Sequence, residues 1–219
     1  MVVLEEIEQV RAGFLKYTRE AFLKLPCLEN PRILDIGCGS GVPTIELAKL
    51  SGGEVTGIDI DQSCIDEFNR KLKEENLANR VEALKLSLYE MKFPDETFDV
   101  VWSEGVVGNI GFETSLKEWR RLLKHNGYLV IHYQVNRVAD VLPRLPQLGY
   151  SLADTVLLPE DAWWTEFYEP IEEKMETLLH KYRDNADALK LLEQYKNERD
   201  MVKRNSSNFI CAFYIMKKV

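Results

Sequence analysis

The chain has 219 residues, of which 45% are apolar and 29% charged, a balance typical of a globular domain with a full core. Its net charge of −8 and its lack of a Lys/Arg run disfavour binding to nucleic acid or to an anionic membrane surface. No apolar stretch approaches membrane-spanning length, and the N-terminus lacks the order of a signal peptide. The four scattered cysteines contain no C-x-x-C and fit a reduced cytosol better than a disulfide or zinc framework. We therefore expect one cytoplasmic domain over residues 1–219, without a metal site.

The first half of the chain predicts alternating helices and strands. Apolar residues at helical spacing over 3–25 predict an amphipathic helix ended by Pro26, and we interpret residues 1–25 as a cap helix. Strands are expected at 32–36, 54–60, 81–86, 98–103 and 128–133, and helices from Val42, over 62–76 and over 112–124, the last closed by Asn126-Gly127. This alternation is typical of right-handed βαβ units and a parallel sheet, so the fold class is α/β.

The regular alternation of predicted helices and strands ends in the last third of the chain. Residues 138–148 look helical although they contain two prolines, and strands are expected at 151–157 and 209–216. Between these strands lie about fifty residues rich in Glu, Lys and aromatics, which predict two helices starting near Pro170 and Ala186. A plain connection would be much shorter, so we interpret residues 159–205 as an inserted helical lid.

One segment carries most of the chemical information: RILDIGCGSGVPTIELAKL, residues 32–50. An apolar strand runs into a loop with Gly37, Gly39 and Gly41, and a helix follows. Glycines allow the sharp turn and the close approach of a ligand, while the helix N-terminus offers free N–H groups. The next strand ends in Asp59, where dinucleotide-binding folds place an acid that accepts both ribose hydroxyls.

The glycine spacing distinguishes between nucleotide cofactors. A dinucleotide fingerprint is G-x-G-x-x-G, but Val42 occupies the position of its last glycine. The chain instead has G-x-G-x-G preceded by Asp35, a carboxylate suited to neutralise the ammonium of S-adenosylmethionine directly or through water. We therefore favour S-adenosylmethionine over a nicotinamide or flavin nucleotide. A glycine turn that binds no ligand is the remaining alternative.

Four ordered motifs between residues 30 and 135 resemble those of class I S-adenosylmethionine-dependent methyltransferases. They are D-I-G-C-G-S-G, V-T-G-I-D-I-D, F-P-D-E-T-F-D-V-V-W-S-E-G and L-K-H-N-G-Y-L-V-I. Within this family the chain is similar to small-molecule methyltransferases of the quinone-biosynthesis type, and to uncharacterised prokaryotic relatives that share W-S-E-G-x-x-x-N-I-G. The resemblance implies a doubly wound, Rossmann-like sheet of seven strands in the order 3-2-1-4-5-7-6, its last strand antiparallel and the helical insertion between the last two strands.

The resemblance also implies the contacts of the cofactor. Gly37, Gly39 and Gly41 would underlie its methionine part, Asp59 would bind the ribose, and Ile60 would flank the adenine. Many relatives carry Gly-Asp at the end of the third strand, where the Asp accepts a hydrogen bond from the adenine amino group. Here the pair is Leu86-Ser87, so we expect Ser87 or the backbone around Leu88 to accept that bond. The alternative is that Ser87 is an ordinary surface residue.

Residues that face the methyl acceptor are expected at the carboxyl ends of the strands. Glu104 follows the fourth strand and is our first candidate on the acceptor side; a capping or cofactor-orienting role is the alternative. His132 ends the fifth strand and is a candidate general base, or else a hydrogen-bonded core histidine. Asn109 either orients an acceptor oxygen or shapes a turn. A general base is needed only if the nucleophile arrives protonated.

The expected lid has an unusual density of aromatic side chains: Trp163, Trp164, Phe167 and Tyr168. They either close over an apolar or aromatic acceptor and exclude water, or form the small core by which the lid docks. Tyr168 also offers a hydroxyl and is our third catalytic candidate. Phe14 and Tyr17 of the cap helix are expected to complete the cover.

The sequence therefore predicts an enzyme that transfers a methyl group from S-adenosylmethionine to a small-molecule acceptor by in-line displacement. It predicts no nucleic-acid or membrane partner. The alternative from another class is a non-catalytic adenosylmethionine-binding or regulatory protein. Methylation of a protein or nucleic acid is disfavoured by the net charge of −8.

Overall fold

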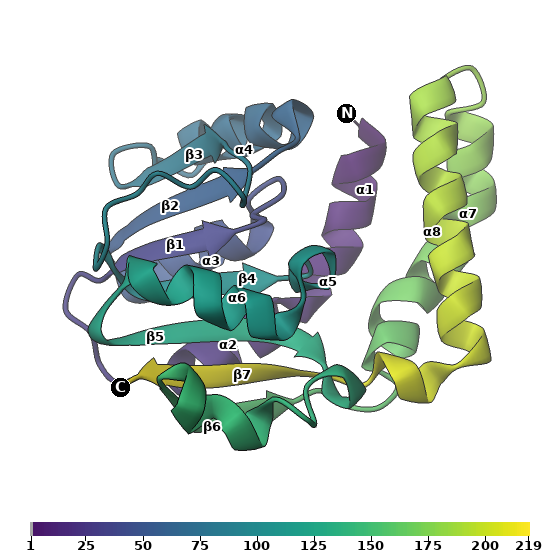
Figure 1. The fold of residues 1–219 in the computed structure, drawn as a ribbon. Helices are drawn as coiled ribbons and strands as arrows, with labels where there is room; N and C mark the ends of the chain where they lie inside the picture. The colour runs from purple at the N-terminus through teal and green to yellow at the C-terminus, as the bar shows by residue number, and fades with distance from the viewer. Residues whose placement is uncertain (1) are drawn as a thin grey trace.

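A single seven-stranded sheet forms the centre of the molecule, in the order β3-β2-β1-β4-β5-β7-β6 (Figure 1). The computed structural model describes the backbone of residues 2–219 and the side chains from residue 6 onward; Met1, the first residue of the expected cap, lies outside the described residues. β7 pairs antiparallel with both β5 and β6, whereas the other neighbours are parallel. The strand order implied by the family resemblance is therefore confirmed.

The elements follow the expected alternation. The strands are β1 (Arg32–Ile36), β2 (Glu54–Asp59), β3 (Val81–Lys85), β4 (Phe98–Glu104), β5 (Leu123–Gln134), β6 (Tyr150–Leu157) and β7 (Cys211–Lys218). The helices are α1 (Val2–Arg11), α2 (Leu15–Leu23), α3 (Val42–Ser51), α4 (Gln62–Glu74), α5 (Val107–Ile110), α6 (Phe112–Trp119), α7 (Glu169–Lys181) and α8 (Ala186–Arg204), with a π-helical turn at Trp164–Tyr168 before α7. No helix within residues 2–219 is both long and apolar enough to cross a bilayer.

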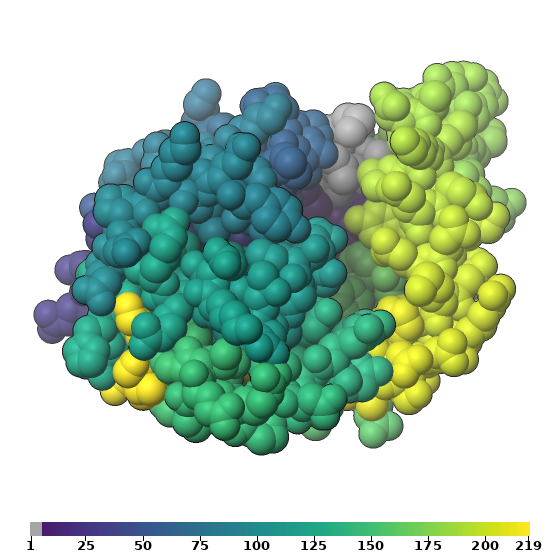
Figure 2. Space-filling model, viewed as in Figure 1, coloured from purple at the N-terminus to yellow at the C-terminus, as the bar shows by residue number. Residues whose placement is uncertain are grey.

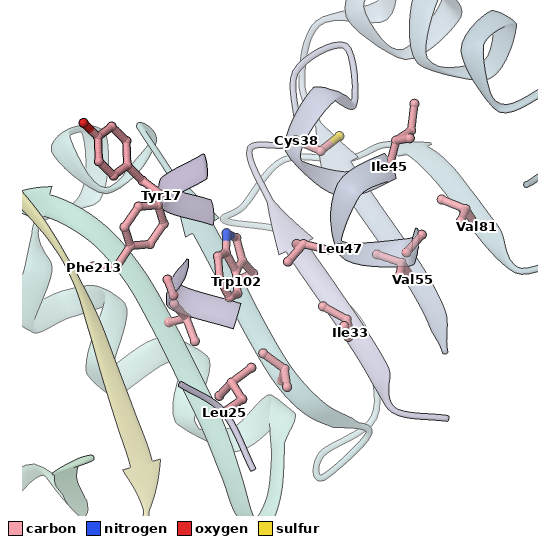
Figure 3. Close-up of a cluster of buried hydrophobic side chains, with 14 of the residues drawn as sticks. Tyr17, Leu25, Ile33, Cys38, Ile45, Leu47, Val55, Val81, Trp102 and Phe213 are labelled. Atoms are coloured by element: carbon pink, nitrogen blue, oxygen red, sulfur yellow. The ribbon is translucent and has the colours of Figure 1, made fainter. Parts of the chain in front are cut away.

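Two apolar layers cover the sheet, because successive residues of a strand point to opposite faces. Ile33 of β1 belongs to the layer covered by α2, α3 and α4, which also holds Trp102 and Phe213 (Figure 3). Leu34, its neighbour, belongs to the layer on the other face, covered by α6 and by the 3₁₀ helix Leu142–Leu148. Both layers are fully buried along β1 and β4, so the central strands form a rigid support for the loops at their ends.

The lid has a third, separate core. α7, α8 and the π-helical turn pack around Phe167, Ile171 and Leu192, and Ile7 of α1 inserts among them. Figure 1 shows α7 and α8 standing beyond the carboxyl ends of the strands, with α1 between them and the body. In the space-filling view they form a distinct lobe, separated from the body by a recess (Figure 2). The insertion expected at 159–205 therefore lies between β6 and β7.

The N-terminal cap differs from the continuous helix expected over 3–25. It consists of α1 and α2, joined by a 3₁₀ turn at Ala12–Phe14. Gly13 lies at the centre of this turn, and glycine has a low helix propensity because it loses more backbone freedom than other residues. The break lets α1 contact the lid while α2 packs against α3.

The helix expected over 112–124 is shorter than predicted. It ends at Trp119, a 3₁₀ turn follows, and β5 begins at Leu123. Asn126, with φ of +62°, lies inside β5, where Phe98 pairs with Leu123 but Val100 pairs with Tyr128. The Asn126-Gly127 pair therefore lies at a register shift within β5 and is not the stop of a helix. The signal was ambiguous, because a left-handed residue followed by glycine suits both features.

Candidate functional site

The loop after β1 has the shape of a ligand cradle. Gly37 and Gly41 have φ of +78° and +83°, and a Cβ on them would lie 2.6 Å from Val106 and 2.0 Å from the ring of Phe68. Both positions therefore require glycine for backbone conformation and for packing. Gly39, with φ of +53°, has nothing within 4 Å of its Cβ position. The open side of the loop is thus at Gly39.

That open side borders a cavity of about 300 Å³, which we call the loop cavity. The glycine loop, the ends of β2 and β4, α1 and the α5 region surround it. Its carboxylates are Glu8, Asp35, Asp59 and Glu104. Four acids around one small cavity favour a cationic ligand.

Asp35 is the most deeply buried of these acids, at 2% exposed. Burial raises the pKa of its carboxyl to about 7; the hydrogen bond from Thr44, at 2.6 Å, opposes this, and the negative charges of Glu104 and Asp59 add to it. A cation placed in the loop cavity would favour the ionised form. Asp35 therefore suits the ammonium group for which the sequence proposed it.

Asp59 is held by the backbone at the end of β2. Its Oδ2 accepts a hydrogen bond from the N–H of Gly39, and its Oδ1 accepts one from the N–H of Asp61, both at 2.9 Å. A carboxylate oxygen can accept two bonds, so each oxygen keeps one position for an incoming donor. The side chain is thus oriented to receive two hydroxyl groups.

Glu104 lies at the end of β4, where its Oε1 accepts hydrogen bonds from the indole N–H of Trp102, at 2.8 Å, and from Thr18, at 3.0 Å. Burial raises the pKa of its carboxyl, and these two bonds counteract the effect. Glu104 borders the loop cavity, together with Asn109, and not the larger cavity described next. This position favours its alternative, cofactor-orienting role over a contact with the acceptor.

A second cavity of about 570 Å³, which we call the lid cavity, lies between the ends of β4 and β5 and the lid. Its aromatic wall consists of Tyr133, Trp163, Phe167, Tyr168, Tyr195 and Phe209. Arg11, Gly105 and Tyr195 border both cavities, so the two spaces adjoin at these residues. A ligand in the loop cavity and one in the lid cavity would therefore meet near Gly105.

His132 borders the lid cavity and is 8% exposed. Its ring packs against Phe213, with centroids 4.8 Å apart, and its Nε2 is buried without a hydrogen-bond partner. Burial, aided by the positive charge of Arg11, lowers the pKa of the imidazole to about 3. His132 is therefore neutral at physiological pH and a weak base.

The positions of the lid aromatics are compatible with both alternatives that the sequence left open. Trp163 and Phe167 border the lid cavity and also pack against Phe14, with ring centroids 4.7 and 6.1 Å apart. Tyr168 borders the cavity too, and its hydroxyl donates to Glu198 at 3.1 Å. Trp164 does not border it. The aromatic cluster thus docks the lid and lines the cavity with the same side chains.

Tyr17 also helps to dock the lid. Its hydroxyl donates to Glu166 of the π-helical turn at 2.6 Å, but Tyr17 does not border either cavity, and its role in covering the acceptor stays a prediction. Among the described residues, no three His, Cys, Asp or Glu side chains are placed to hold a metal ion together.

The residues expected at the adenine do not border the loop cavity. Ile60 follows Asp59 directly and is 70% exposed. The hydroxyl oxygen of Ser87 accepts the N–H of Tyr89 at 3.3 Å, and Leu88 packs against the apolar layer under α6. All three follow the carboxyl ends of β2 and β3, beside Asp59, and their contact with adenine stays a prediction.

Two residues of the site escaped the sequence analysis. Arg11 and Tyr195 border both cavities, although they lie in α1 and α8, far from the glycine motif. The sequence contains 28 Lys and Arg residues, and no pattern around Arg11 distinguishes it from the others. Only the folded arrangement brings it to the end of β4.

A family model described as a methyltransferase domain matches residues 34–131, which run from β1 to β5. The central part of the chain is thus similar to methyltransferase domains. A demethylmenaquinone methyltransferase of Geobacillus sp. is 33% identical over 119 residues, 53% of this chain and 50% of that protein. A sterol 24-C-methyltransferase of Aspergillus fumigatus is 32% identical over 105 residues, 48% of this chain and 28% of that protein. The chain thus spans half or less of these two relatives.

Solved structures are similar to this chain over the sheet and the lid together. An adenosylmethionine-dependent methyltransferase from Geobacter sulfurreducens, solved with S-adenosylhomocysteine, has a TM-score of 0.74 at 18% identity, covering 93% of this chain and 91% of that one. The [4+2]-cyclase SpnF has a TM-score of 0.77 at 19% identity, covering 93% of this chain and 80% of that one. At such identities the likeness establishes the fold. That one neighbour is a cyclase shows that this fold also supports other chemistry.

Proposed function

We propose that this chain is an enzyme that transfers a methyl group from S-adenosylmethionine to a small molecule held in the lid cavity. The observation that carries the proposal is the contact between the two cavities. One is surrounded by the glycine loop and four acids, and the other by aromatic rings, and they adjoin at Gly105. A methyl donor and an acceptor placed in them would meet near Gly105.

The residues of the loop cavity fit this cofactor. Asp35 would bind the ammonium group, and Asp59, with one free position on each oxygen, would bind the two ribose hydroxyls. Glu104 would face the methionine part and its positive sulfur. When bound, S-adenosylmethionine supplies an electrophilic methyl group on a sulfonium, and the electrons of the broken C–S bond stay on sulfur. The absence of a phosphate group in this cofactor suits a cavity bordered by acids.

The protein would contribute mainly by aligning the methyl donor with the acceptor and by excluding water from them. Holding two reacting groups in line is worth roughly 7–11 kcal/mol of the barrier. The aromatic wall would exclude water from the acceptor, as residues 159–205 close the cavity as a lid. His132 would contact the acceptor with an uncharged ring, because it borders the lid cavity and its pKa is low. Its low pKa argues against strong proton abstraction before methyl transfer.

The aromatic wall supports an acceptor that contains a ring and apolar surface. The relatives named for demethylmenaquinone and sterols are consistent with such an acceptor. All four cysteines are free, which supports our proposal that the chain works in the cytoplasm. The fold of SpnF keeps one alternative open, an adenosylmethionine-binding protein that does not transfer methyl groups.

Two measurements test the proposal in sequence. Calorimetry with S-adenosylhomocysteine should show binding to the wild type and to Asp140→Ala, whose exposed carboxylate lies outside both cavities, but not to Asp59→Ala. Release of S-adenosylhomocysteine from S-adenosylmethionine is then measured with a library of ring-containing small molecules. Failure of the wild type to bind would overturn the proposal. Binding without turnover on any acceptor would favour the non-catalytic alternative.

A further inference from the structure

Arg11, the last residue of α1, lies where the two cavities meet. It is the only positively charged residue that borders the loop cavity among the described residues. Its Nη2 lies 3.4 Å from the position that a Cβ on Gly105 would take. Its charge also lowers the pKa of Glu104 and of His132, on β4 and β5. No described side chain or backbone group forms a hydrogen bond or ion pair with this guanidinium.

An unpaired guanidinium among acids needs a partner of opposite charge. The ligand proposed for this cavity carries, besides its two cationic groups, one carboxylate. Surrounded by Glu8, Asp35, Asp59 and Glu104, that carboxylate would be repelled unless a cation accompanies it. Arginine is the side chain best suited to a carboxylate, because its planar fork can donate two parallel hydrogen bonds.

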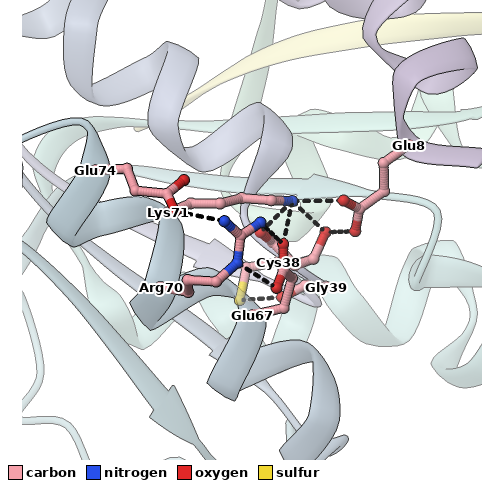
Figure 4. A network of polar contacts seen from close by, with 8 residues as sticks. Glu8, Cys38, Gly39, Glu67, Arg70, Lys71 and Glu74 are labelled. Carbon is pink, nitrogen blue, oxygen red and sulfur yellow. Dashed lines mark hydrogen bonds and ion pairs between the residues drawn. The ribbon is translucent and has the colours of Figure 1, made fainter. Parts of the chain in front are cut away.

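The helix that carries Arg11 is also joined to the glycine loop. The carboxylate of Glu8 accepts a hydrogen bond from Ser40 Oγ and another from Lys71 Nζ, the latter at 2.5 Å. Figure 4 shows Glu8 reaching from α1 to Lys71, above Cys38 and Gly39 of the loop. Lys71 in addition donates to the Ser40 carbonyl at 3.2 Å. α1 is thereby linked to the cofactor side of the molecule.

The same helix is joined to the lid. Glu6 accepts hydrogen bonds from Lys181 Nζ at 2.5 Å and from the Tyr182 hydroxyl at 3.1 Å, both at the end of α7. Ile7, 2% exposed, is buried in the lid core. α1 therefore connects the glycine loop to α7, and its last residue borders both cavities.

We propose that Arg11 binds the carboxylate of the cofactor's methionine part, and that this contact fixes α1 and the lid in place before the acceptor binds. This inference rests on the proposed function. A ligand stabilises the conformation to which it binds better. An ion pair at Arg11 adds a ligand contact to a helix that already holds the loop and the lid. Since Arg11 also borders the lid cavity, the cofactor completes one of its walls, and binding is ordered, cofactor first.

Two matched ligands test the contact: S-adenosylmethionine and its decarboxylated form, which differ only in the carboxylate. By calorimetry, Arg11→Gln should weaken S-adenosylmethionine binding about 10- to 100-fold, the range expected for charged hydrogen bonds, and change binding of the decarboxylated form less than about twofold. Arg11→Lys should fall between, because it keeps the charge without the planar fork. The control is Arg19→Gln, which breaks an ion pair to Glu46 outside both cavities.

Hydrogen exchange tests the effect on α1 and the lid. Amides of α1 and α7 should exchange more slowly with S-adenosylmethionine than with the decarboxylated ligand in the wild type, and equally with both in Arg11→Gln. Equal weakening of both ligands by Arg11→Gln, or equal protection of the wild type by both, would overturn the inference. If the wild type bound neither ligand, the proposed function itself would fall. Thermal unfolding of each variant confirms that it folds, and Arg11→Lys carries the test if Arg11→Gln does not.

Discussion

Glu104 and His132 are paired neighbours at the ends of β4 and β5; both border one small cavity, and each also borders one of the two larger cavities. Glu104 borders the loop cavity, whereas His132 borders the lid cavity. The sheet register thus brings the donor side and the acceptor side of the proposed reaction together on two adjacent strands. Both groups are buried, and burial acts on each in favour of the neutral form: it raises the pKa of the carboxyl and lowers that of the imidazole.

Cofactor affinity should rise with pH through about 7 because of Asp35. Its pKa is about 7 in the empty site, and a bound ammonium favours the ionised form, so binding below that value requires release of a proton. Calorimetry between pH 5.5 and 8.5 should show affinity falling up to about tenfold per pH unit below 7. Asp35→Asn, which keeps the acceptor for Thr44, should bind weakly with little pH dependence. Equal pH dependence in both proteins would contradict this role.

The same shift has a consequence for stability. Because the folded pKa of Asp35 lies above its unfolded value, ionisation opposes folding of the empty protein. Its contribution is most favourable at low pH and is lost as pH rises from about 4 to about 7. In chemical unfolding, the free energy of unfolding of Asp35→Asn relative to the wild type should therefore increase over this interval. A constant difference would show that Asp35 is not perturbed by burial.

Gly39→Ala and Gly41→Ala should separate binding from folding. A Cβ at position 41 would lie 2.0 Å from Phe68 in a fully packed layer, so this variant should lose about 1–3 kcal/mol of stability or more. A Cβ at position 39 meets no protein atom, so its stability cost should be limited to about 1–2 kcal/mol for the left-handed backbone. It would instead occupy the ligand's space, and binding should be lost. Thermal unfolding and calorimetry on both variants measure the contrast.

His132→Phe should fold at least as well as the wild type. The replacement removes a buried nitrogen without a hydrogen-bond partner, a group that costs about 1–3 kcal/mol, and keeps an aromatic ring beside Phe213. Turnover of an identified acceptor should fall about tenfold or more, whereas S-adenosylhomocysteine should bind unchanged. The pH profile of the wild type should show no inflection from His132 above pH 5, since its pKa is about 3. A loss of cofactor binding would instead indicate a structural role.

Ile171→Ala should loosen the lid without unfolding the sheet. Ile171 is 1% exposed in the lid core, and such truncations cost about 2–5 kcal/mol. Since this core is separate from the two layers on the sheet, we expect faster hydrogen exchange in α7 and α8 and unchanged exchange in β1 and β4. Leu116→Ala, in the layer under α6, is the matched control that should affect the sheet. Equal effects on both regions would show that lid and body unfold together.

The sequence predicted the central fold because each signal was local. The glycine loop, the acid at the end of β2 and the alternation from β1 to β5 are all short patterns that the backbone must obey. The break at Gly13 was missed, because helical spacing continued across it while contacts of α1 with the lid and of α2 with α3 decided the geometry. Arg11 could not be found, because its role depends on proximity to β4, which no local pattern encodes. For the same reason, local sequence patterns did not show that Glu104 borders the loop cavity.

The lid joins the sheet at two adjacent positions. Leu157, the last residue of β6, pairs with Ala212 of β7, so residues 158–210 leave and re-enter the sheet at neighbouring points. A segment attached in this way can change in length or sequence without altering the register of any strand. Under the proposed function, changes within residues 158–210 would alter the walls of the lid cavity and leave the strands beneath the glycine loop in register.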